Sequence, residues 1–393
     1  MTSSVNSLRD IRRSFLPLGW TAFGGPAAHL GYFRTECVGR RGWLSDTTYA
    51  DLVAMSQFLP GPASSKVGMA LGYGRAGLSG MAYSWFLFTF PSALILTVCG
   101  LTLPGSGISW LEGALTGLLA AAAGVVVHAI VGMGRKLLTT ITAWALALIS
   151  SVMLIVAGSA WQLVVLAVAG VLGATVLRRC LPTSSSPTTS EKLRPVPAGL
   201  AWGCVAAFFL LLGGLAAAAQ LSGGYLLTRA NAFYQSGALV FGGGHVVLPL
   251  LEEQFVGSGW LTQEEFLAGY SVAQGVPGPL FTFASYLGGV DGGLGGAVLG
   301  TVLIFLPGAL LTLAALHFWA RWNHLAWLRG ALSAVSAAVI GLLVAALWDP
   351  ILAHGVTGWA TGLIAVAAGA ALFAKAPPWA VAVGAALAGA LLL

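Results

Sequence analysis

Two Pro-Gly-Pro motifs interrupt apolar stretches of the chain, Pro60-Gly61-Pro62 and Pro277-Gly278-Pro279. Each proline removes a main-chain donor and clashes with the preceding helical turn, so a helix cannot run through either motif. In lipid, the main-chain groups released at such a break must be buried in protein or face water. A helix that restarts after the break presents free N–H groups and a partial positive charge. The motifs therefore predict anion-binding helix N-termini.

The side chains that follow the motifs are hydrogen-bond donors. Ser64, Ser65 and Lys66 come directly after the first motif, as the first turn of a new helix would. The hydroxyls can donate to an oxyanion, and the ammonium can donate a charge-assisted hydrogen bond. The alternative role for Lys66 is to extend its ammonium toward the membrane interface. Thr282 is the corresponding hydroxyl in the second half, where its neighbours are phenylalanines, so we expect the first half to supply most of the positive charge.

Two glycine-rich motifs, Phe23-Gly24-Gly25-Pro26 and Phe241-Gly242-Gly243-Gly244, have two interpretations. Their glycines either allow close helix packing or expose main-chain N–H groups to a ligand. The predicted anion-binding residues are Gly24, Gly25, Gln57, Gly61, Ser64, Ser65, Lys66, Gly243, Gly244, His245, Gln274, Gly278 and Thr282. The residues predicted to break helices are Pro26, Pro60, Pro62, Pro277 and Pro279.

Candidate proton carriers lie near these motifs. They are His29, Glu36, Asp51 and His245. Histidine changes its charge near neutral pH, and a carboxylate can carry a proton when its surroundings raise its pKa. The alternatives are hydrogen-bonded packing for the histidines and surface positions for the carboxylates. We interpret His128 and Glu112 as structural.

The motifs recur in the same order in both halves of the chain. Gly42-Trp43-Leu44-Ser45 corresponds to Gly259-Trp260-Leu261-Thr262, Gln57 corresponds to Gln274, and Pro91 corresponds to Pro307. The offset between corresponding residues is nearly constant. The order of glycine, tryptophan, glutamine and proline indicates an internal duplication, which in a membrane protein is typical of secondary transporters.

The composition indicates a membrane protein. Hydrophobic residues make up 58% of the 393 residues and charged residues only 8%, whereas a soluble protein carries roughly a quarter charged residues. We predict an all-α polytopic membrane protein with about 13 spans, each near 20 residues long. The predicted spans are 15–33, 50–72, 79–103, 109–132, 139–157, 159–177, 199–221, 231–251, 266–289, 294–316, 325–347, 356–374 and 378–393.

The spans define two repeats with opposite predicted orientations. The first repeat is 1–177, a polar linker follows at 178–198, an extra helix lies at 199–221, and the second repeat is 222–393. An odd number of crossings before the second repeat inverts it. Basic loops place the N-terminus and the linker in the cytoplasm.

Two loops, 34–46 and 252–265, carry charges that contradict this simple count. Each loop follows the first helix of a repeat. We therefore predict that the first two helices of each repeat form a broken, re-entrant hairpin that need not cross fully.

Several classes of function are disfavoured by the sequence. The four cysteines are scattered without metal-ligand spacing, and no cluster of acid, base or metal ligands falls in the spans. There is no phosphate-binding loop for ATP. The net charge of +6 is spread over loops, which fits membrane orientation better than nucleic-acid binding. We expect no enzyme activity, metal, cofactor or nucleic-acid partner; a passive channel is the alternative to a carrier.

The paired glycine and Pro-Gly-Pro motifs resemble those of the chromate ion transporter family in its long, two-domain form. The resemblance covers essentially the whole chain and maps family motifs onto Phe23–Pro26, Pro60–Pro62, Phe241–Gly244 and Pro277–Pro279. It implies a multi-pass carrier of the bacterial inner membrane that exports chromate, uses the proton gradient and confers chromate resistance. Sulfate, which has the same shape and charge, is the implied competitor. The family more often has glutamine at the position of Lys66, which leaves a carrier of sulfate or another oxyanion as the alternative. A homodimer is compatible with these expectations.

Overall fold

The computed structural model describes residues 2–22, 25–103, 109–158, 161–177, 194–240, 247–322 and 325–393. Within these ranges the regular structure is helical, as predicted, and no strand occurs. The chain forms two compact units that each combine segments from both sequence halves. The first unit comprises Met1–Leu101, Ser186–Val247 and Pro277–Asn323, and the second comprises Thr102–Ser185, Leu248–Val276 and His324–Leu393.

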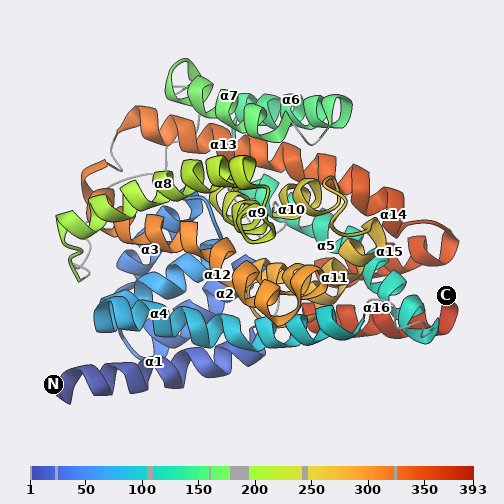
Figure 1. Cartoon of the computed structure of the whole chain (residues 1–393), viewed down its shortest axis with the longest axis horizontal. Coiled ribbons are helices and arrows are strands. Elements are labelled where there is room, and N and C mark those ends of the chain that lie inside the picture. Colours follow the sequence, from blue (N-terminus) through green and yellow to red (C-terminus); the bar gives the residue numbers. More distant parts are fainter. Residues whose placement is uncertain are drawn as a thin grey trace. The chain divides into compact units, whose positions relative to one another are not determined.

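The first unit contains the Pro-Gly-Pro motifs and the long helices beside them. Its helices are α1 (Thr2–Thr21), α2 (Gly25–Phe33), α3 (Asp46–Phe58), α4 (Ala63–Thr102), α8 (Ala198–Ser222), α9 (Tyr225–Leu239) and α12 (Phe283–Trp322). A π-helical turn at Arg34–Arg40 follows α2, and a 3₁₀ turn at Leu280–Thr282 precedes α12. Helices α8 and α9 lie side by side and pack on α12 (Figure 1).

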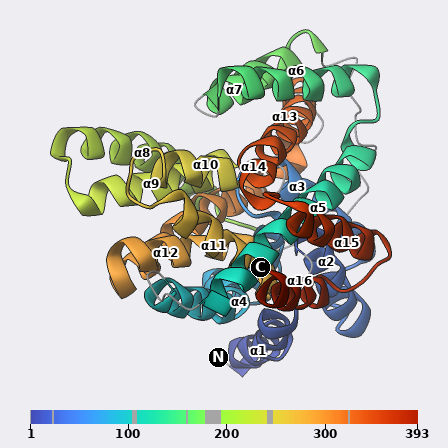
Figure 2. The same ribbon diagram turned by 90° about the vertical axis from the view of Figure 1, so that its right-hand side faces the viewer.

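The second unit is built around two central helices. Its helices are α5 (Ser109–Leu137), α6 (Ile141–Ala157), α7 (Gln162–Ala174), α10 (Val247–Phe255), α11 (Gln263–Gly275), α13 (Ala326–Ala346), α14 (Ala353–Gly355), α15 (Trp359–Phe373) and α16 (Pro378–Leu392), with a π-helical turn at Leu347–Leu352. Helix α13 packs along α6 and α7, and α15 and α16 pack on α5 (Figure 2). Small residues allow this close packing; a Cβ atom on Gly113 would lie 2.8 Å from the carbonyl oxygen of Gly389.

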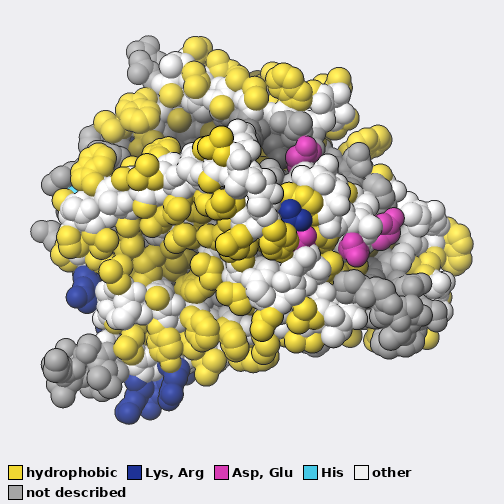
Figure 3. Space-filling model, in the orientation of Figure 1, with side chains coloured by type: hydrophobic (Ala, Val, Ile, Leu, Met, Phe, Trp, Pro, Cys, Tyr) yellow, Lys and Arg dark blue, Asp and Glu magenta, His cyan; other side chains and the backbone are white. Residues whose placement is uncertain are grey.

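The surface of the described residues is suited to lipid. Large apolar side chains are exposed on helices throughout the described residues, including Trp144, Leu210 and Val366, and hydrophobic side chains are spread widely over the face in Figure 3, with few charged ones among them. Among the described residues, four helices are long and apolar enough to cross a membrane. They are Ala63–Thr102, Ala198–Ser222, Leu280–Phe318 and Ala326–Ala345. Shorter apolar helices accompany them, so the chain is a polytopic, multi-pass membrane protein.

Four of the predicted spans are not continuous helices. The stretches 15–33, 50–72, 231–251 and 266–289 are each interrupted near the middle. Helix α1 ends at Thr21 before α2 begins, and α3 ends at Phe58 before α4 begins at Ala63. These stretches are the first two predicted helices of each repeat, where the glycine and proline motifs predicted a broken hairpin.

Helices α4 and α12 each fold back on themselves. Main-chain angles leave the helical region at Ala76 and Gly77 in α4, and at Gly292 and Gly293 in α12. Each helix therefore has a short arm (63–75 or 283–291) and a long arm (78–102 or 294–322). The arms touch, because a Cβ atom on Gly72 would meet the carbonyl of Gly80. Each long arm is about 37 Å or more in length, enough to cross a hydrocarbon core of about 30 Å.

Candidate functional site

The first repeat starts with two short hairpins whose ends lie together. Phe15 of α1 meets Phe33 at the end of α2, with ring centroids 5.3 Å apart. Asp10 of α1 contacts Arg41 after α2 at 3.9 Å and Arg75 at the end of the short arm of α4 at 3.5 Å. Asp10, Arg41 and Arg75 therefore lie at the same end of these helices, so α1 runs away from that end and α2 runs back toward it. The chain then leaves that end along α3 and returns along the short arm of α4.

The breaks at the tips of these hairpins lie well away from the end that carries Asp10. From Asp10 to Ala22, the residue that follows α1, the rise along the helix axis is about 18 Å. This is roughly half of a hydrocarbon core about 30 Å thick. The predicted interruptions at both Pro-Gly-Pro motifs are present, since helix resumes only at Ala63 in the first half and at Leu280 in the second.

A reciprocal pair of hydrogen bonds joins the breaks of the two halves. The N–H of Gly61 donates to the carbonyl of Val240 at 2.6 Å, and the N–H of Gly278 donates to the carbonyl of Ala22 at 2.9 Å. Gly61 and Gly278 are corresponding residues of the repeat, as are Ala22 and Val240. Each Pro-Gly-Pro motif is therefore held by the end of the first helix of the other half.

Both glycines are required by this arrangement. Gly61 has φ +92° and Gly278 has φ +105°, conformations that residues with a side chain rarely adopt. A Cβ atom on Gly61 would lie 3.2 Å from Cα of Gly308, and one on Gly278 would lie 2.7 Å from Oγ of Ser92. At Gly61 the close neighbour is main chain, and at Gly278 it is the side chain of Ser92, so a side chain at either position would have to displace its neighbour.

His29 connects the end of α1 to the start of α4 through side-chain hydrogen bonds. The ring is buried, with Nε2 3.1 Å from the carbonyl oxygen of Ala22 and Nδ1 3.3 Å from Oγ of Ser64. Because a carbonyl only accepts, we assign the ring proton to Nε2, and Nδ1 then accepts from the Ser64 hydroxyl. The carbonyl of Ala22 also accepts from Gly278, so one oxygen atom receives a donor from each half.

The side chain of Lys66 points back toward the break at Pro60-Gly61-Pro62. Its side chain is fully buried, and Nζ donates to the main-chain carbonyls of Leu59 and Pro60, the latter at 3.0 Å. These carbonyls follow the end of α3, where a continuous helix would have supplied N–H donors. The ammonium group therefore satisfies acceptors that the Pro-Gly-Pro motif leaves free.

The other predicted hydroxyls and amides have different surroundings. Ser65 is buried, and its Oγ has no hydrogen-bond partner among the described residues. Oγ1 of Thr282 donates to the carbonyl of Pro279 at 2.6 Å. Gln57 is half-buried in α3. In the second unit, Nε2 of Gln274 is buried and also has no partner in the described part of the chain.

For the remaining predicted residues, the structure gives the position and burial of some, and others lie outside the described residues. Gly25 and Pro26 begin α2 directly after the first break and are half-buried, with φ +72° at Gly25. Pro60, Pro62, Pro277 and Pro279 are buried. Phe23, Gly24, the motif Phe241–Gly244 and His245 lie outside the described residues.

Charged clusters lie at the two chain reversals. At the first, Asp10 pairs with Arg75, and the guanidinium of Arg194 lies 3.4 Å from where a Cβ atom on Gly77 would be. At the second, Arg229 binds both carboxylate oxygens of Asp291 at 2.9 Å. Asp291 corresponds to Arg75 in the repeat, so corresponding positions at the two reversals carry charges of opposite sign, and each is paired.

The two reversals lie near opposite ends of the long arm of α4. That arm begins at the first reversal. Near its other end, a Cβ atom on Gly100 would lie 2.6 Å from the carbonyl oxygen of Tyr286, fewer than two helical turns from Asp291. The rise from Ala76 to Gly100 is about 36 Å. The two charged clusters are thus separated by about the thickness of a membrane.

The chain matches the chromate transporter family over residues 9–174 and 227–390. It belongs to that family. This confirms the resemblance seen in the motifs, and the two matched regions contain corresponding copies of them. Family members and relatives are transporters, not enzymes.

Individual relatives cover nearly the whole transporter. A probable chromate transport protein of Synechococcus elongatus is 29% identical over 98% of this chain and 95% of its own length. The chromate transport protein of Pseudomonas aeruginosa is 28% identical over 91% of this chain and 85% of its own. An uncharacterized transporter of Methanocaldococcus jannaschii is 26% identical over 86% and 83%. No solved structure matches the chain.

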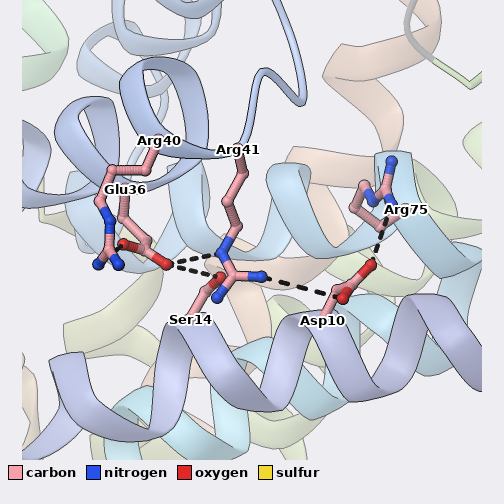
Figure 4. A network of polar contacts seen from close by, with 6 residues as sticks. All are labelled: Asp10, Ser14, Glu36, Arg40, Arg41 and Arg75. Atoms are coloured by element: carbon pink, nitrogen blue, oxygen red, sulfur yellow. Dashed lines mark hydrogen bonds and ion pairs between the residues drawn. The ribbon is translucent and has the colours of Figure 1, made fainter.

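The candidate proton carriers of the transporter are separated in the structure. His29 lies at the breaks, Asp51 is half-buried in α3, and Glu36 lies in the π-helical turn near Asp10. Glu36 accepts hydrogen bonds from Arg41 at 2.6 Å, Arg40 at 2.9 Å and Ser14 at 3.3 Å (Figure 4).

The Glu36 carboxylate is stabilised in its charged form. Burial alone would raise the pKa of Glu36. The hydrogen bond from Arg41 and the charges of Arg41 and Arg40 together lower it by more, so the net shift of the pKa is downward. Arg41 and Arg75 also lie over the ring of Trp43, at 5.9 and 5.2 Å from its centre. This arrangement suits a structural ion pair better than a group that releases and takes up protons near neutral pH.

Sequence reasoning missed several contributors to this region. Ala22 and Val240 act through main-chain carbonyls, which no residue type reveals. Arg229 and Asp291 carry charges in otherwise apolar segments, and the correspondence of Asp291 with Arg75 is a signal that could have identified that pair.

Proposed function

We propose that this chain is a secondary transporter that exports chromate across the bacterial inner membrane and uses the proton gradient to do so. Chromate resistance would be the physiological result. The observation that carries the proposal is the reciprocal bonding of Gly61 to Val240 and of Gly278 to Ala22, beside a buried ammonium group. The substrate is supported by family membership and by relatives named chromate transport proteins.

The chemistry at the breaks favours a divalent oxyanion. Helix α2 and the short arms of α4 and α12 all begin there, so their free N–H groups and positive dipole ends face the same region. The hydroxyl of Ser65 is buried and unpaired among the described residues, and in this proposal the amino group of the buried Lys66 supplies positive charge. Sulfate would compete, because it presents the same shape and charge to these donors.

We further propose that the halves are inverted and that their hairpins are re-entrant. The pairing of Asp10 with both Arg41 and Arg75 supports a common side for the N-terminus, loop 34–46 and the first reversal. The basic residues on that side favour the cytoplasm. The position of the second reversal, about 36 Å along the long arm of α4, supports the opposite side for Asp291.

The repeat boundaries remain part of this proposal. Repeats at 1–177 and 222–393, with a linker at 178–198 and a connecting helix at 199–221, agree with the two family matches. Helix α8 spans Ala198–Ser222, where the connecting helix is expected.

Alternating access follows from this arrangement as a proposal. Each hairpin tip is bonded to the other half, so a rocking movement that opens one side must break or exchange one of the reciprocal hydrogen bonds. His29 is the proton carrier best placed to influence this step. A second ring proton would make Nδ1 a donor and force the Ser64 hydroxyl to accept, which changes the contact between α2 and α4.

Uptake into everted membrane vesicles tests the proposed function. Vesicles containing the transporter should accumulate chromate when a proton gradient is imposed, and excess sulfate should reduce the accumulation. Vesicles without the transporter, and energised vesicles treated with an uncoupler, are the controls. Equal accumulation in all samples would reject proton-coupled chromate transport.

A further inference from the structure

The ammonium group of Lys66 is buried without a counter-ion in the described part of the chain. The side chain is 0% exposed, and none of the ion pairs formed by described carboxylates includes it. A buried charge is costly unless other groups replace its hydration. Here the replacement comes from the carbonyls of Leu59 and Pro60.

These carbonyls have the character of cation ligands. They are consecutive and directly follow the C-terminal end of α3, where the helix dipole places partial negative charge. Carbonyls of unwound helices and half-helix C-terminal ends coordinate monovalent cations inside transporters. The stem of Lys66 packs beside Gly308; a Cβ atom there would lie 3.6 Å from Cγ of Lys66, an ordinary contact.

The second half shows that the break itself does not need a lysine. Lys66 and Phe283 each stand four residues after the last proline of their motif. Phe283 is fully buried, and the second Pro-Gly-Pro motif still interrupts the helix and still forms its reciprocal hydrogen bond. The ammonium group of Lys66 therefore serves a purpose specific to the first half.

We propose that the carbonyls of Leu59 and Pro60 form a site for a small monovalent cation, and that the chain fills this site with its own Lys66 ammonium. An ammonium group has three donors, of which two are used by these carbonyls. The third remains available at the restart of the helix, where Ser65 contributes its unpaired hydroxyl.

The consequence for transport rests on the proposed function. A positive charge fixed at the break neutralises part of the charge of a bound dianion without a free cation that must be carried along. In a chain with an apolar side chain at position 66, we expect a cation from solution to bind the carbonyls of Leu59 and Pro60.

The variant Lys66→Met tests the cation site directly. Methionine reproduces the length of the lysine stem and removes only the ammonium group, so it leaves a gap next to the two carbonyls. Thermal unfolding of the purified full chain in detergent is compared in ammonium chloride and in choline chloride at equal ionic strength. Choline is too large for the gap left by the missing ammonium group. The Tm of Lys66→Met should therefore be at least about 2 °C higher in ammonium chloride than in choline chloride. The wild-type Tm should not respond.

The matched control is Phe283→Met, which places methionine at the corresponding position of the other half. It should show no ammonium response. No response in folded Lys66→Met, or an equal response in Phe283→Met, would overturn the proposal. If Lys66→Met does not fold in choline, refolding yield becomes the readout: recovery in ammonium supports the site, and equal failure in both salts overturns it. No chromate is present, so this result and the transport assay fail independently.

Discussion

His29 and Lys66 act on main-chain carbonyls at helix breaks, and both are buried. Their roles differ in kind. His29 donates to the carbonyl of Ala22, which also accepts from Gly278 of the second half. Lys66 donates to the carbonyls of Leu59 and Pro60, which belong to the first Pro-Gly-Pro break alone. Glu36 lies elsewhere, in an ion network near Asp10, and it holds the ends of the first hairpins together.

Replacement of His29 by leucine should weaken chromate binding about tenfold. The variant loses two hydrogen bonds worth roughly 1 kcal/mol each, and a tenfold loss corresponds to about 1.4 kcal/mol, so we expect most of this energy to appear as lost affinity. Binding of radiolabelled chromate to purified protein measures this. His128→Leu is the control, because His128 packs edge-on against Phe373 much as His29 packs against Phe88, but His128 lies in the second unit. Unchanged affinity in His29→Leu would remove His29 from the site.

Replacement of Glu36 by glutamine should destabilise the protein at neutral pH by about 1.5–3 kcal/mol, because charged hydrogen bonds to Arg41 and Arg40 are lost. The lowered pKa of Glu36 means that its stabilising effect is present above its ordinary pKa and disappears as pH falls through the folded value. The difference in Tm from wild type should therefore shrink below about pH 4.

The exposed Glu264 provides the comparison for Glu36. Glu264→Gln should change stability by no more than about 0.5 kcal/mol. A deficit in Glu36→Gln that is constant from pH 7 to low pH would contradict the assigned ion pair.

At the scale of elements, the proposed site is formed by helices that end at a glycine or proline motif and begin again after it. The proline and glycine motifs were sufficient to predict the interruptions, because those residues act locally on the main chain. The reversals inside α4 and α12 were also predicted, because the expected spans end at 72 and 289 and restart at 79 and 294, on either side of Gly77 and Gly293. The reciprocal hydrogen bonds were not predicted, because they connect main-chain atoms far apart in sequence.

Alanine at Gly61 or Gly278 should be more destabilising than alanine at Gly158. All three glycines have positive φ, with Gly158 at +89°, but nothing lies within 4 Å of a Cβ atom on Gly158. Gly158→Ala isolates the main-chain strain, about 1–3 kcal/mol. The other two variants add a clash with Gly308 or Ser92. Chemical denaturation measures the differences; equal losses for all three variants would contradict the close approach.

At the scale of the whole molecule, sequence duplication and loop charge predicted a two-repeat membrane protein, and membership of the chromate transporter family agrees with it. The count of about 13 spans treated each apolar stretch as one crossing. The four stretches that are broken helices in the structure are the first two helices of each repeat, where a broken hairpin was predicted. The composition of a stretch reports its affinity for lipid and does not report whether the chain crosses or returns.

Cysteine labelling from each side of the membrane should reveal the inverted, re-entrant arrangement. In a background without native cysteines, Gly39→Cys and Ser79→Cys should react with an impermeant thiol reagent from the cytoplasmic side. Gly295→Cys, beyond the second reversal, should react from the opposite side; all three positions are exposed. Labelling of Gly39→Cys only from the periplasm would contradict the re-entrant hairpin. Labelling of Ser79→Cys and Gly295→Cys from one side would contradict the inversion.

The most direct test of the central claim is equilibrium binding of radiolabelled chromate to the purified transporter and to its glycine variants. We predict saturable binding to wild type, a loss of at least about tenfold in Gly61→Ala and in Gly278→Ala, equivalent to about 1.4 kcal/mol, and near-normal binding in Gly158→Ala. That pattern would locate the anion where the broken helices of the two halves meet. Saturable binding that is unaffected in both Gly61→Ala and Gly278→Ala would contradict this location.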